Sequence, residues 1–470
     1  MKTDHLVVGG GLTGLMAALT LKKLNPSDGV VIVEREPEVG GLLRSFNYGR
    51  YGYFDYGMHN FLESGDTELD EMLRSLLPSD EWNVLDGNRR DLAGLYWNKK
   101  IQYNSPYPDV RNCSVTYQKE LREYLAKETL TAPLSHYQNA GDFVKARFGV
   151  RALEQIFEPI LNRTFGNASS DLDEMACKLI PLDRVGLFDL VEMEKVLANP
   201  RLRERVAYAE QRQLPLEFSS GRTAFYPKEF GVFRVIDSLV EKLESQGVQI
   251  LVNSKVESIC DSDGKISSVE IRQRDQASVI TVSQNVHWTA GLLGLAPLLW
   301  PGNSAKPPDQ PYNLELVNIL VKNPSRMQDL YYIYCADREF RTFRVTNYFG
   351  YCPKAKNEFG YPLGVEMLFP PNLKLSSEEI QNIALKEVLQ MGLIDKIEDI
   401  SFSKLESFKY AFPLPTIGNT KFFDDLRQKI KSKGISNLVC SGVLAEKSLF
   451  FQSAVLRDMY LKVVNRSKVE

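Results

Sequence analysis

The chain has 470 residues, which is long enough for two or three domains of ordinary size. Hydrophobic residues make up 43% of it and charged residues 25%, as is typical of a globular protein. The 57 basic and 60 acidic side chains leave a formal net charge of -3. This balance argues against a nucleic-acid partner, because proteins that bind nucleic acids usually carry a basic excess or a basic stripe.

The six cysteines are isolated along the sequence, with no C-x-x-C pair and no zinc spacing. We expect free thiols in a reducing compartment, although one disulfide is compatible with the sequence, and we expect no metal site. The N-terminus "MKTDHLVVGGGLTGL" is too polar and too rich in glycine for a signal peptide. The most apolar stretch, "GLLGLAPLLW", is about half the length that spans a bilayer, so it predicts a buried helix. We therefore expect a cytoplasmic protein without a transmembrane segment, with peripheral membrane contact left open.

The N-terminus reads as a strand, a glycine turn and a helix. Gly9, Gly11 and Gly14 form G-x-G-x-x-G directly after an apolar run, and helical spacing follows. The first glycine permits a tight turn, the second lets a pyrophosphate approach the backbone, and the third lets the helix pack close to the strand. Leu12 and Thr13 begin that helix, whose free N–H groups would face the phosphates.

A second strand, "GVVIVER", follows and ends at Glu34 and Arg35. An acid at this place accepts hydrogen bonds from the ribose hydroxyls of a dinucleotide. A second glycine pair, Gly40 and Gly41, then precedes Arg44 in "GGLLRS". These features together predict a dinucleotide-binding unit.

The stretches "VGGGLTGLMAAL" and "VIVEREPEVGGLLRS" resemble those of the FAD-dependent amine oxidase and protoporphyrinogen oxidase superfamily. The resemblance implies FAD as the cofactor, with Arg44 near the flavin and the pyrophosphate. It also implies an α/β fold, in which an FAD-binding Rossmann-like domain carries an inserted helical domain and an inserted antiparallel sheet. Within the superfamily, the chain is most similar to UDP-galactopyranose mutase in its eukaryotic form.

Two later stretches would return to the cofactor. After "AFYPKEF" a long amphipathic helix and the strand "VQILVNSKVESI" are expected, and the resemblance places a backbone group near Val256 against the adenine. The C-terminal "GISNLVCSGVLAEKSLFFQSAVLRDMYLKVV" predicts a strand, Gly442 and a closing helix that points at the flavin.

We predict a discontinuous FAD-binding domain from residues 1–75, 215–300 and 415–470. A helical cap domain is predicted over residues 115–212, with "QKELREYLAKETL" and "LRERVAYAEQ" as its clearest helices. Residues 76–114 and 310–412 would form the sheet of a substrate domain. The aromatic and polar alternation in "DLYYIYCADREFRTFRVTNYFGY" has the period of two that is typical of strands.

Four stretches carry the resemblance to the mutase: "FDYGMHNF", "GLYWNKKIQYNSPYPDVRN", "FEPILNRTFGNASSDLDEMACKLIPLDRVGLFD" and "FRTFRVTNYFGYCP". The first implies that Gly57, Met58 and His59 lie against the flavin, with His59 tuning the cofactor and closing the pocket. The last two imply that Arg184 and Arg344 hold the diphosphate of a nucleotide sugar, because guanidinium forks bind phosphates bidentately. His59, Arg184 and Arg344 are therefore the candidate catalytic residues. The alternatives are a plain core histidine at His59, a helix-end cation or surface ion pair at Arg184, and a solvent-facing strand residue at Arg344.

The chain departs from the mutase pattern at two places. In "YAFPLPT", Phe412 stands where the family has a phosphate-binding tyrosine, and Tyr410 lies two residues earlier. The C-terminal "CSGVLAEKSLFFQSAV" lacks the second phosphate-binding tyrosine and its neighbouring arginine, and Glu446 is the nearest acid after Gly442. Ring contraction of galactopyranose is therefore not the expected reaction.

Three functions follow from this pattern. The first is an FAD-dependent oxidoreductase or mutase-type isomerase that acts on a nucleotide-linked or phosphorylated sugar in polysaccharide or glycoconjugate biosynthesis. The second is an FAD-dependent oxidase or dehydrogenase of an amine or hydrophobic substrate. The third is a flavoprotein partner without turnover. No second G-x-G-x-x-G is present, so NAD(P)H or another reductant would visit the flavin. The sequence gives no oligomeric state.

Overall fold

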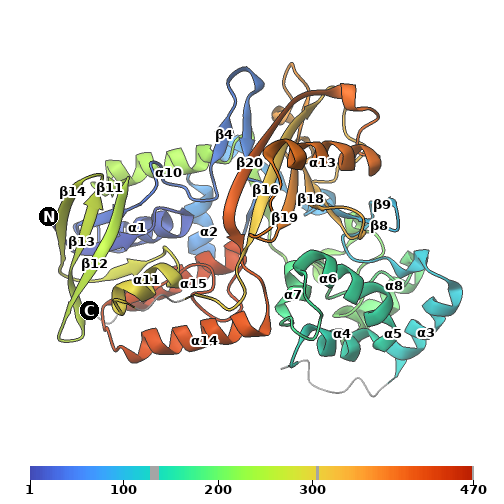
Figure 1. The fold of residues 1–470 in the computed structure, drawn as a ribbon, viewed down its shortest axis with the longest axis horizontal. Helices are drawn as coiled ribbons and strands as arrows, with labels where there is room; N and C mark the ends of the chain where they lie inside the picture. The colour runs from blue at the N-terminus through green and yellow to red at the C-terminus, as the bar shows by residue number, and fades with distance from the viewer. Residues whose placement is uncertain (128–136, 303–305, 468–470) are drawn as a thin grey trace.

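The computed structural model describes residues 1–127, 137–302 and 306–467 (Figure 1). A five-stranded parallel sheet in the order β11-β3-β2-β15-β21 lies at the centre of the cofactor-side half. Its strands are β2 (His5–Val8), β3 (Val30–Val33), β11 (Gln249–Leu251), β15 (Val286–Trp288) and β21 (Leu438–Cys440). Every residue of β2, β3 and β15 is buried, as expected of parallel strands that are covered on both faces. The predicted α/β fold class is confirmed.

The two faces of this sheet pack against different layers. Val7 packs with helices α1 (Leu12–Leu24), α10 (Phe233–Ser245) and α15 (Gln452–Ser467), while Leu6 and Val8 face a second sheet. That sheet consists of β1 (Lys2–Thr3), β14 (Gln276–Val282), β13 (Lys265–Gln273) and β12 (Ser254–Ser262). This alternation follows from the period of two along a strand.

A seven-stranded sheet forms the upper right of Figure 1, with helix α13 (Ser377–Gln390) packed on it. Its strands, in sheet order, are β20 (Ile400–Phe412), β16 (Tyr312–Val321), β19 (Tyr361–Phe369), β18 (Thr342–Asn347), β17 (Tyr332–Cys335), β8 (Ala93–Trp97) and β9 (Lys100–Gln102). The strands predicted from the aromatic alternation are confirmed. The end of this aromatic stretch is not a strand but α12 (Tyr348–Tyr351), a single helical turn.

A helical group with its own hydrophobic core lies at the lower right of Figure 1. It contains α3 (Val115–Ala126), α4 (Ala140–Phe148), α5 (Val150–Ala152), a π-helix (Leu153–Phe157), α6 (Glu158–Phe165), α7 (Met175–Leu179), α8 (Leu190–Ala198) and α9 (Pro200–Arg203). The helix predicted over "QKELREYLAKETL" is present up to Ala126, and residues 128–130 lie outside the described residues. The helix predicted over "LRERVAYAEQ" is wrong beyond Arg203. The following residues instead form a bridge to Val185, which takes up their backbone hydrogen bonds.

Shorter elements complete the structure. These are β4 (Ser45–Asn47), β5 (Tyr53–Asp55), β6 (Phe61–Leu62), α2 (Thr67–Arg74), β7 (Trp82–Leu85), β10 (Ala224–Pro227), α11 (Leu292–Leu299) and α14 (Ile417–Ser432). The prediction that "GLLGLAPLLW" forms a buried helix is confirmed by α11. Within the described ranges, no helix has the length and apolar character needed to cross a membrane.

Two predictions near the cofactor side need correction. The stretch "VQILVNSKVESI" forms two strands, β11 and β12, that join different sheets. The closing helix does not begin after Gly442 but at Gln452. A loop intervenes, in which Leu444 and Ser448 have φ of 60° and 62°, and these left-handed residues are incompatible with a continuous helix.

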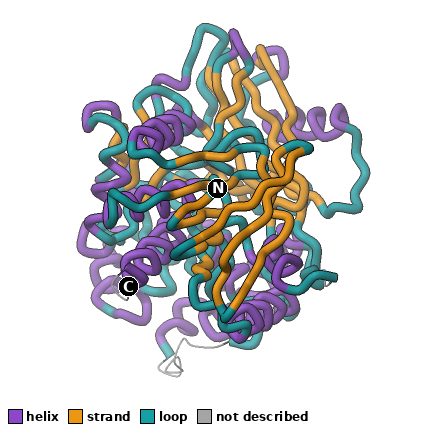
Figure 2. The backbone as a smooth tube through the Cα atoms, turned by 90° about the vertical axis from the view of Figure 1, so that its left-hand side faces the viewer, coloured by secondary structure: helices purple, strands orange, loops and turns teal. Residues whose placement is uncertain are grey.

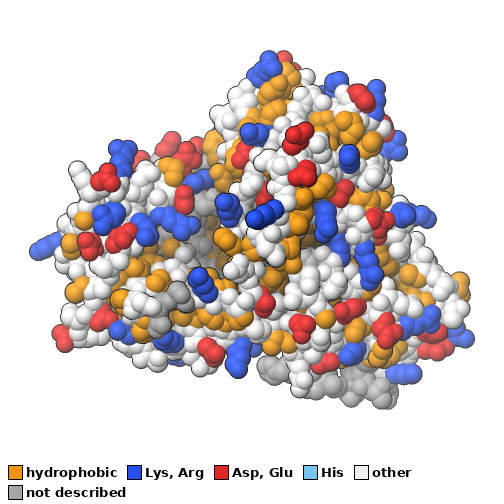
Figure 3. Space-filling view, viewed as in Figure 1, with side chains coloured by type: hydrophobic (Ala, Val, Ile, Leu, Met, Phe, Trp, Pro, Cys, Tyr) orange, Lys and Arg blue, Asp and Glu red, His pale blue; other side chains and the backbone are white. Residues whose placement is uncertain are grey.

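Strands run through the middle of the molecule and helices lie around them (Figure 2). Lysine and arginine side chains are interspersed with acidic ones over the face drawn in Figure 3. Hydrophobic side chains are also visible there, where the sheet of β16 and β20 approaches helices α11 and α14.

Candidate functional site

The G-x-G-x-x-G turn lies at the carboxyl end of β2. Gly9 has a φ of 106°, which favours glycine, and a Cβ atom on Gly14 would lie 1.9 Å from the carbonyl oxygen of Gly9. A Cβ atom on Gly11, by contrast, would meet nothing within 4 Å. Gly11 is the N-cap of α1 and supplies no capping side chain, so the helix that begins at Leu12 and Thr13 has no side-chain cap for its first N–H groups. This arrangement fits a pyrophosphate.

The second glycine pair lies against the first turn. The Gly40 N–H donates to the Gly10 carbonyl at 2.8 Å, and Gly40 also forms a bridge with Gly11. A Cβ atom on Gly41 would lie 3.3 Å from the Gly11 Cα atom. Both glycine motifs therefore line the same space. Arg44 follows this pair, with its Nε held by the Val39 carbonyl at 2.9 Å.

Glu34 anchors the first turn from the end of β3. Its Oε2 accepts the Gly10 N–H at 2.6 Å, and its Oε1 accepts the Glu36 N–H at 2.9 Å. Arg35 points outward, with its side chain 76% exposed and paired with Glu36. Of these two adjacent predicted residues, only Glu34 directs its side chain toward the glycine turn.

Val256 and Gly442 come from distant parts of the sequence. The Ser254 N–H donates to the Glu34 carbonyl at 2.8 Å, which places β12, and Val256 two residues later, beside the acid. A Cβ atom on Gly442 would lie 3.4 Å from the Thr289 carbonyl oxygen, and the Thr289 hydroxyl lies 3.0 Å from the Gly9 carbonyl oxygen. Thr289 thus connects the two predicted glycines that follow β2 and β21. The sequence reasoning missed Thr289, whose only sequence signal is its position directly after the buried strand β15.

A buried carboxylate supports the loop that carries His59. Asp55 accepts hydrogen bonds from Ser45 Oγ at 2.5 Å, from Tyr226 OH at 2.5 Å and from the Val232 N–H at 3.0 Å. Burial raises the pKa of Asp55 to about 6, and these three donors only partly offset that effect. The Tyr348 hydroxyl donates to the Asp55 carbonyl at 3.1 Å.

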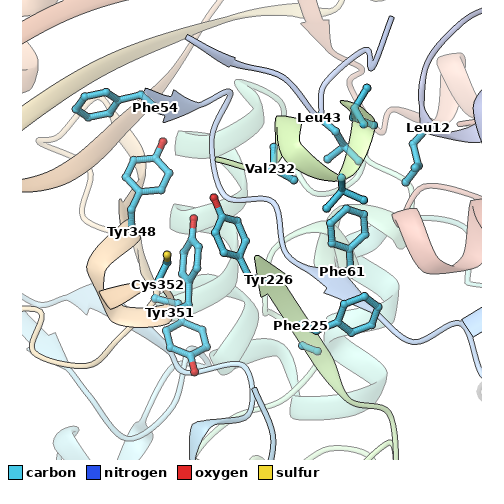
Figure 4. Close-up of a cluster of buried hydrophobic side chains, with 14 of the residues drawn as sticks. Leu12, Leu43, Phe54, Phe61, Phe225, Tyr226, Val232, Tyr348, Tyr351 and Cys352 are labelled. Carbon is cyan, nitrogen blue, oxygen red and sulfur yellow. The ribbon is translucent and has the colours of Figure 1, made fainter. Parts of the chain in front are cut away.

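Figure 4 shows the tyrosines Tyr226, Tyr348 and Tyr351 side by side beneath Phe54, although they come from β10 and α12. The sequence reasoning missed this role for Asp55. The available signal was an aspartate between Phe54 and Tyr56, inside an otherwise aromatic stretch.

His59 lies close to a buried ion pair. A Cβ atom on Gly57, whose φ is 111°, would lie 3.1 Å from Glu366 Oε1. Arg344 donates to that carboxylate from Nε at 3.0 Å and from Nη2 at 2.9 and 2.8 Å. Burial, reinforced by the charge of Arg344, lowers the pKa of His59 to about 4. His59 is therefore a neutral imidazole at pH 7, and its side chain is only partly buried, as is that of Met58.

Arg184 approaches the same region from the helical group. Its guanidinium lies 5.8 Å from the centre of the Tyr107 ring, and its buried Nε has no hydrogen-bond partner among the described residues. Burial, followed by the charge of Asp183, raises the pKa of Tyr107 to about 12. An unpartnered buried N–H is costly, so the Arg184 fork is available for a ligand.

Aromatic side chains connect Arg184 to Arg344. The Arg344 guanidinium lies 5.8 Å from the Tyr332 ring centre, and the Tyr332 hydroxyl donates to Asp91 at 3.3 Å. Asp91 and Tyr334 both act electrostatically on Tyr107, which contacts Arg184. Burial raises the pKa of Asp91 although its side chain reaches water. The charges of Arg344 and Asp91 also act on Tyr334, and Arg344 acts on His59. These shared neighbours bring Arg184, Arg344 and His59 into one region, here called the cleft.

The residues that depart from the mutase pattern do not restore its phosphate contacts. The Phe412 ring lies 5.8 Å from that of Phe343, which in turn lies 5.3 Å from Tyr334, so Phe412 belongs to the aromatic wall of the cleft. Tyr410 is 57% exposed. Glu446 is paired with Lys462 at 2.8 Å.

Comparisons with known proteins agree with this geometry. A family model described as an NAD(P)-binding Rossmann-like domain matches residues 7–76. Coproporphyrinogen III oxidase of Staphylococcus aureus is 22% identical over 283 residues, covering 56% of each chain. The 1-hydroxycarotenoid 3,4-desaturase of a Flavobacterium species is 24% identical over 275 residues, covering 56% of this chain and 52% of the desaturase. The chain thus spans about half the length of the curated relatives that it matches.

Solved structures match over the whole chain. Reduced UDP-galactopyranose mutase superposes with a TM-score of 0.76 at 15% identity, covering 100% of this chain and 96% of the mutase. A putative protoporphyrinogen oxidase from an Exiguobacterium species gives a TM-score of 0.69 at 13% identity, covering 100% and 99%. Putrescine oxidase gives a TM-score of 0.60 at 13% identity, with the same coverage. At these identities the likeness establishes the fold.

Proposed function

Since this chain has the fold of the FAD-dependent amine oxidase-like superfamily and FAD as its cofactor, we propose that it is a flavoenzyme acting on a nucleotide-linked or phosphorylated sugar. The proposal rests on one observation: the unpartnered buried Nε of Arg184 belongs to the same group of charged and aromatic side chains as Arg344 and His59. Biosynthesis of polysaccharides or glycoconjugates is the setting that such a substrate suggests.

Bound FAD would supply the electron-transfer chemistry, while the protein positions and shields the substrate. The pyrophosphate would lie over the open space at Gly11, and Glu34 would accept from the ribose beside its hydrogen bond to Gly10. The residues proposed to hold FAD are Gly9, Gly11, Leu12, Thr13, Gly14, Glu34, Arg35, Gly40, Gly41, Arg44, Gly57, Met58, His59, Val256 and Gly442.

The two arginines have unequal parts in this proposal. Glu366 already occupies Nε and Nη2 of Arg344, so that side chain has only Nη1 to offer a phosphate. Arg184 has no such carboxylate partner among the described residues, and it would provide the main anion contact. His59, neutral at pH 7, would close the cleft beside the flavin as a hydrogen-bonding imidazole.

The test is a titration of the purified flavoprotein with UDP, followed by the visible absorption of the flavin. We expect a saturable spectral shift, weakened at least about tenfold in Arg184→Gln, because a charge-assisted contact to a phosphate contributes about 1.5–3 kcal/mol. Arg457→Gln, which removes an exposed charge on α15, is the matched control and should bind as the wild type does. A flavin spectrum indifferent to UDP, or equal weakening in both variants, would overturn the sugar-nucleotide proposal.

The aromatic wall of the cleft favours a second candidate, an oxidase or dehydrogenase of an amine or hydrophobic substrate. Tyr332, Tyr334, Phe343 and Phe412 lie in sequence along this wall with ring centres 5.3–5.8 Å apart. The relatives named as porphyrinogen oxidases, carotenoid desaturase and putrescine oxidase support such a substrate. Anaerobic bleaching of the flavin by putrescine or by coproporphyrinogen, without any phosphate ligand, would be the positive sign.

We further propose that residues 1–75, 215–300 and 415–470 act as the FAD-binding domain, residues 115–212 as a cap, and residues 76–114 and 310–412 as the substrate domain. An NAD(P)H or other reductant would reach the flavin from solvent. Reduction of the flavin by NADPH in the absence of light and substrate tests the second point.

A further inference from the structure

A second hollow lies between helix α6 and one end of the seven-stranded sheet. Its volume is about 380 Å³, within the range of pockets that bind small molecules. Its walls come from α6 and the turn after it, from the start of β16, from the turn before β18 and from the end of β19.

The charged side chains that line this hollow are all positive. Three arginines, Arg163, Arg338 and Arg341, are among its lining residues, and no aspartate or glutamate is. Within the described ranges, none of the three forms an ion pair. The neighbouring carboxylates of Glu387 and Asp337 act on the charge of Arg163 without pairing with it, and Glu387 accepts the backbone N–H groups of Arg341 and Thr342, both at 2.7 Å. The hollow therefore holds three guanidinium groups that have no ion-pair partner among the described residues.

Arg163 is the most constrained of them. Its Nη2 donates to the carbonyls of Phe340 and Thr342, while its Nε is buried without a hydrogen-bond partner. Burial lowers the pKa of Arg163, which means that its positive charge is poorly solvated. A guanidinium that is held only by carbonyl dipoles and retains an unused N–H is suited to a bound anion.

The remaining walls are aromatic. Tyr312, Phe340 and Phe343 line the hollow, and the Tyr312 hydroxyl is occupied by the Phe165 carbonyl at 3.0 Å. Phe343 also contacts Tyr334 of the flavin-side cleft at a ring distance of 5.3 Å, so it forms a shared wall between the two spaces. Aromatic walls accept a flat or apolar part of a ligand next to its charged part.

We propose that this hollow is a second anion-binding site, distinct from the Arg184 and Arg344 pair. It takes a small molecule with a phosphate or carboxylate group and a flat or apolar remainder. Arg163 holds the anion from within, and Arg338 and Arg341 close over it from the surface.

The experiment is calorimetric titration of the flavoprotein in an Arg184→Gln background, from which the free guanidinium of the cleft has been removed. Pyrophosphate and citrate are used in separate titrations as phosphate and carboxylate probes. We expect saturable binding of at least one probe, weakened about fivefold or more when Arg341→Gln is added, since one charge-assisted contact is lost. Adding Arg457→Gln instead should leave the affinity unchanged.

Absence of binding by both probes in the Arg184→Gln background would overturn the proposal, and so would equal affinity with and without Arg341→Gln. Arg341→Gln and Arg457→Gln both change exposed side chains. The flavin content and unfolding temperature of each variant report whether its fold is intact. The outcome does not depend on the UDP titration of the flavin, which probes the cleft. The probe that binds more tightly identifies the anionic group of the ligand.

Discussion

The buried pair of Arg344 and Glu366 makes a quantitative prediction for the Glu366→Gln variant. Glu366 is 3% exposed and Arg344 20%, so removing the carboxylate leaves a guanidinium with little water to solvate it. Two unit charges about 4 Å apart interact by about 4 kcal/mol at an effective dielectric constant near 20. Breaking one partner of a buried pair typically costs about 3–5 kcal/mol. Allowing for the partial exposure of Arg344, we expect a loss of about 3 kcal/mol.

The assay is thermal unfolding of the flavoprotein, followed in parallel by circular dichroism and by release of flavin fluorescence. A chain of this size need not unfold in two states, so the midpoints of matched variants are compared rather than absolute free energies. Glu398→Gln removes an exposed carboxylate from the same half of the molecule and should leave both midpoints unchanged. The double variant Arg344→Met with Glu366→Gln should recover part of the loss, because it contains no unpaired buried charge.

Glu366→Gln also distinguishes the contribution of Glu366 to stability from its effect on ligand binding. In Glu366→Gln the remaining amide oxygen can still accept from Arg344 but carries no negative charge, so the guanidinium charge is left uncompensated and an anion in the cleft should bind more tightly than to the wild type. A midpoint equal to that of Glu398→Gln would refute the reasoning about the ion pair. Tighter UDP binding in Glu398→Gln as well would show that net charge, rather than the uncompensated guanidinium, is responsible.

Three further predictions concern the cofactor turn and the loop before His59. Gly11→Val should fold but retain little flavin per mole of protein, because its side chain fills the open space that the pyrophosphate needs. His59 has a lowered pKa of about 4, so its unfolded form binds a proton that the folded form refuses between about pH 6.5 and 4. The wild type should lose stability as the pH falls through that window, and melting curves of His59→Asn should lack this part of the slope. The pKa shift of Asp55 has the opposite effect on stability. Because its pKa is raised to about 6, the wild type loses stability as the pH rises from about 3.8 through 6. The melting temperature of Asp55→Asn relative to the wild type should therefore rise over the same interval.

The cofactor half could be predicted because its signals are local. The strand β2, the turn at Gly9 and the whole of α1 lie within the first 24 residues. Each is predicted by a separate local signal: the buried apolar run, the glycines and the helical spacing. Glu34 was predictable for the same reason, since it directly follows the next buried strand. Thr289 could not be predicted in this way. It joins Gly9 to Gly442 only because β15 lies between β2 and β21 in the sheet, which no local signal reveals.

The cleft was harder to predict because the residues that contact one another there are far apart in the sequence or belong to no recognisable motif. Arg344 was predicted as a phosphate ligand. Its carboxylate partner Glu366 lies on the neighbouring strand, and only the register of β18 and β19 reveals that pair. Asp55 joins Tyr226 across 171 residues. The loop before Gln452 was read as helix because its two left-handed positions are Leu444 and Ser448 rather than glycine.

A substitution at Phe412 should have opposite effects for the two proposed classes of substrate. Its ring lies between those of Phe343 and Phe165, at 5.8 and 6.3 Å, so a hydroxyl added by Phe412→Tyr has no polar partner in the aromatic wall itself. Such a group costs about 1–3 kcal/mol if it stays buried and unsatisfied, and it recovers that cost only against a polar ligand. If nucleotide sugars occupy the cleft, Phe412→Tyr should melt at a lower temperature without ligand, bind UDP about fivefold more tightly, and regain its stability when UDP is added. If the substrate is hydrophobic, UDP will have no such effect and flavin reduction by that substrate will slow in the variant. Ligand-dependent recovery of the melting temperature, rather than activity alone, therefore distinguishes the two functions at a single side chain.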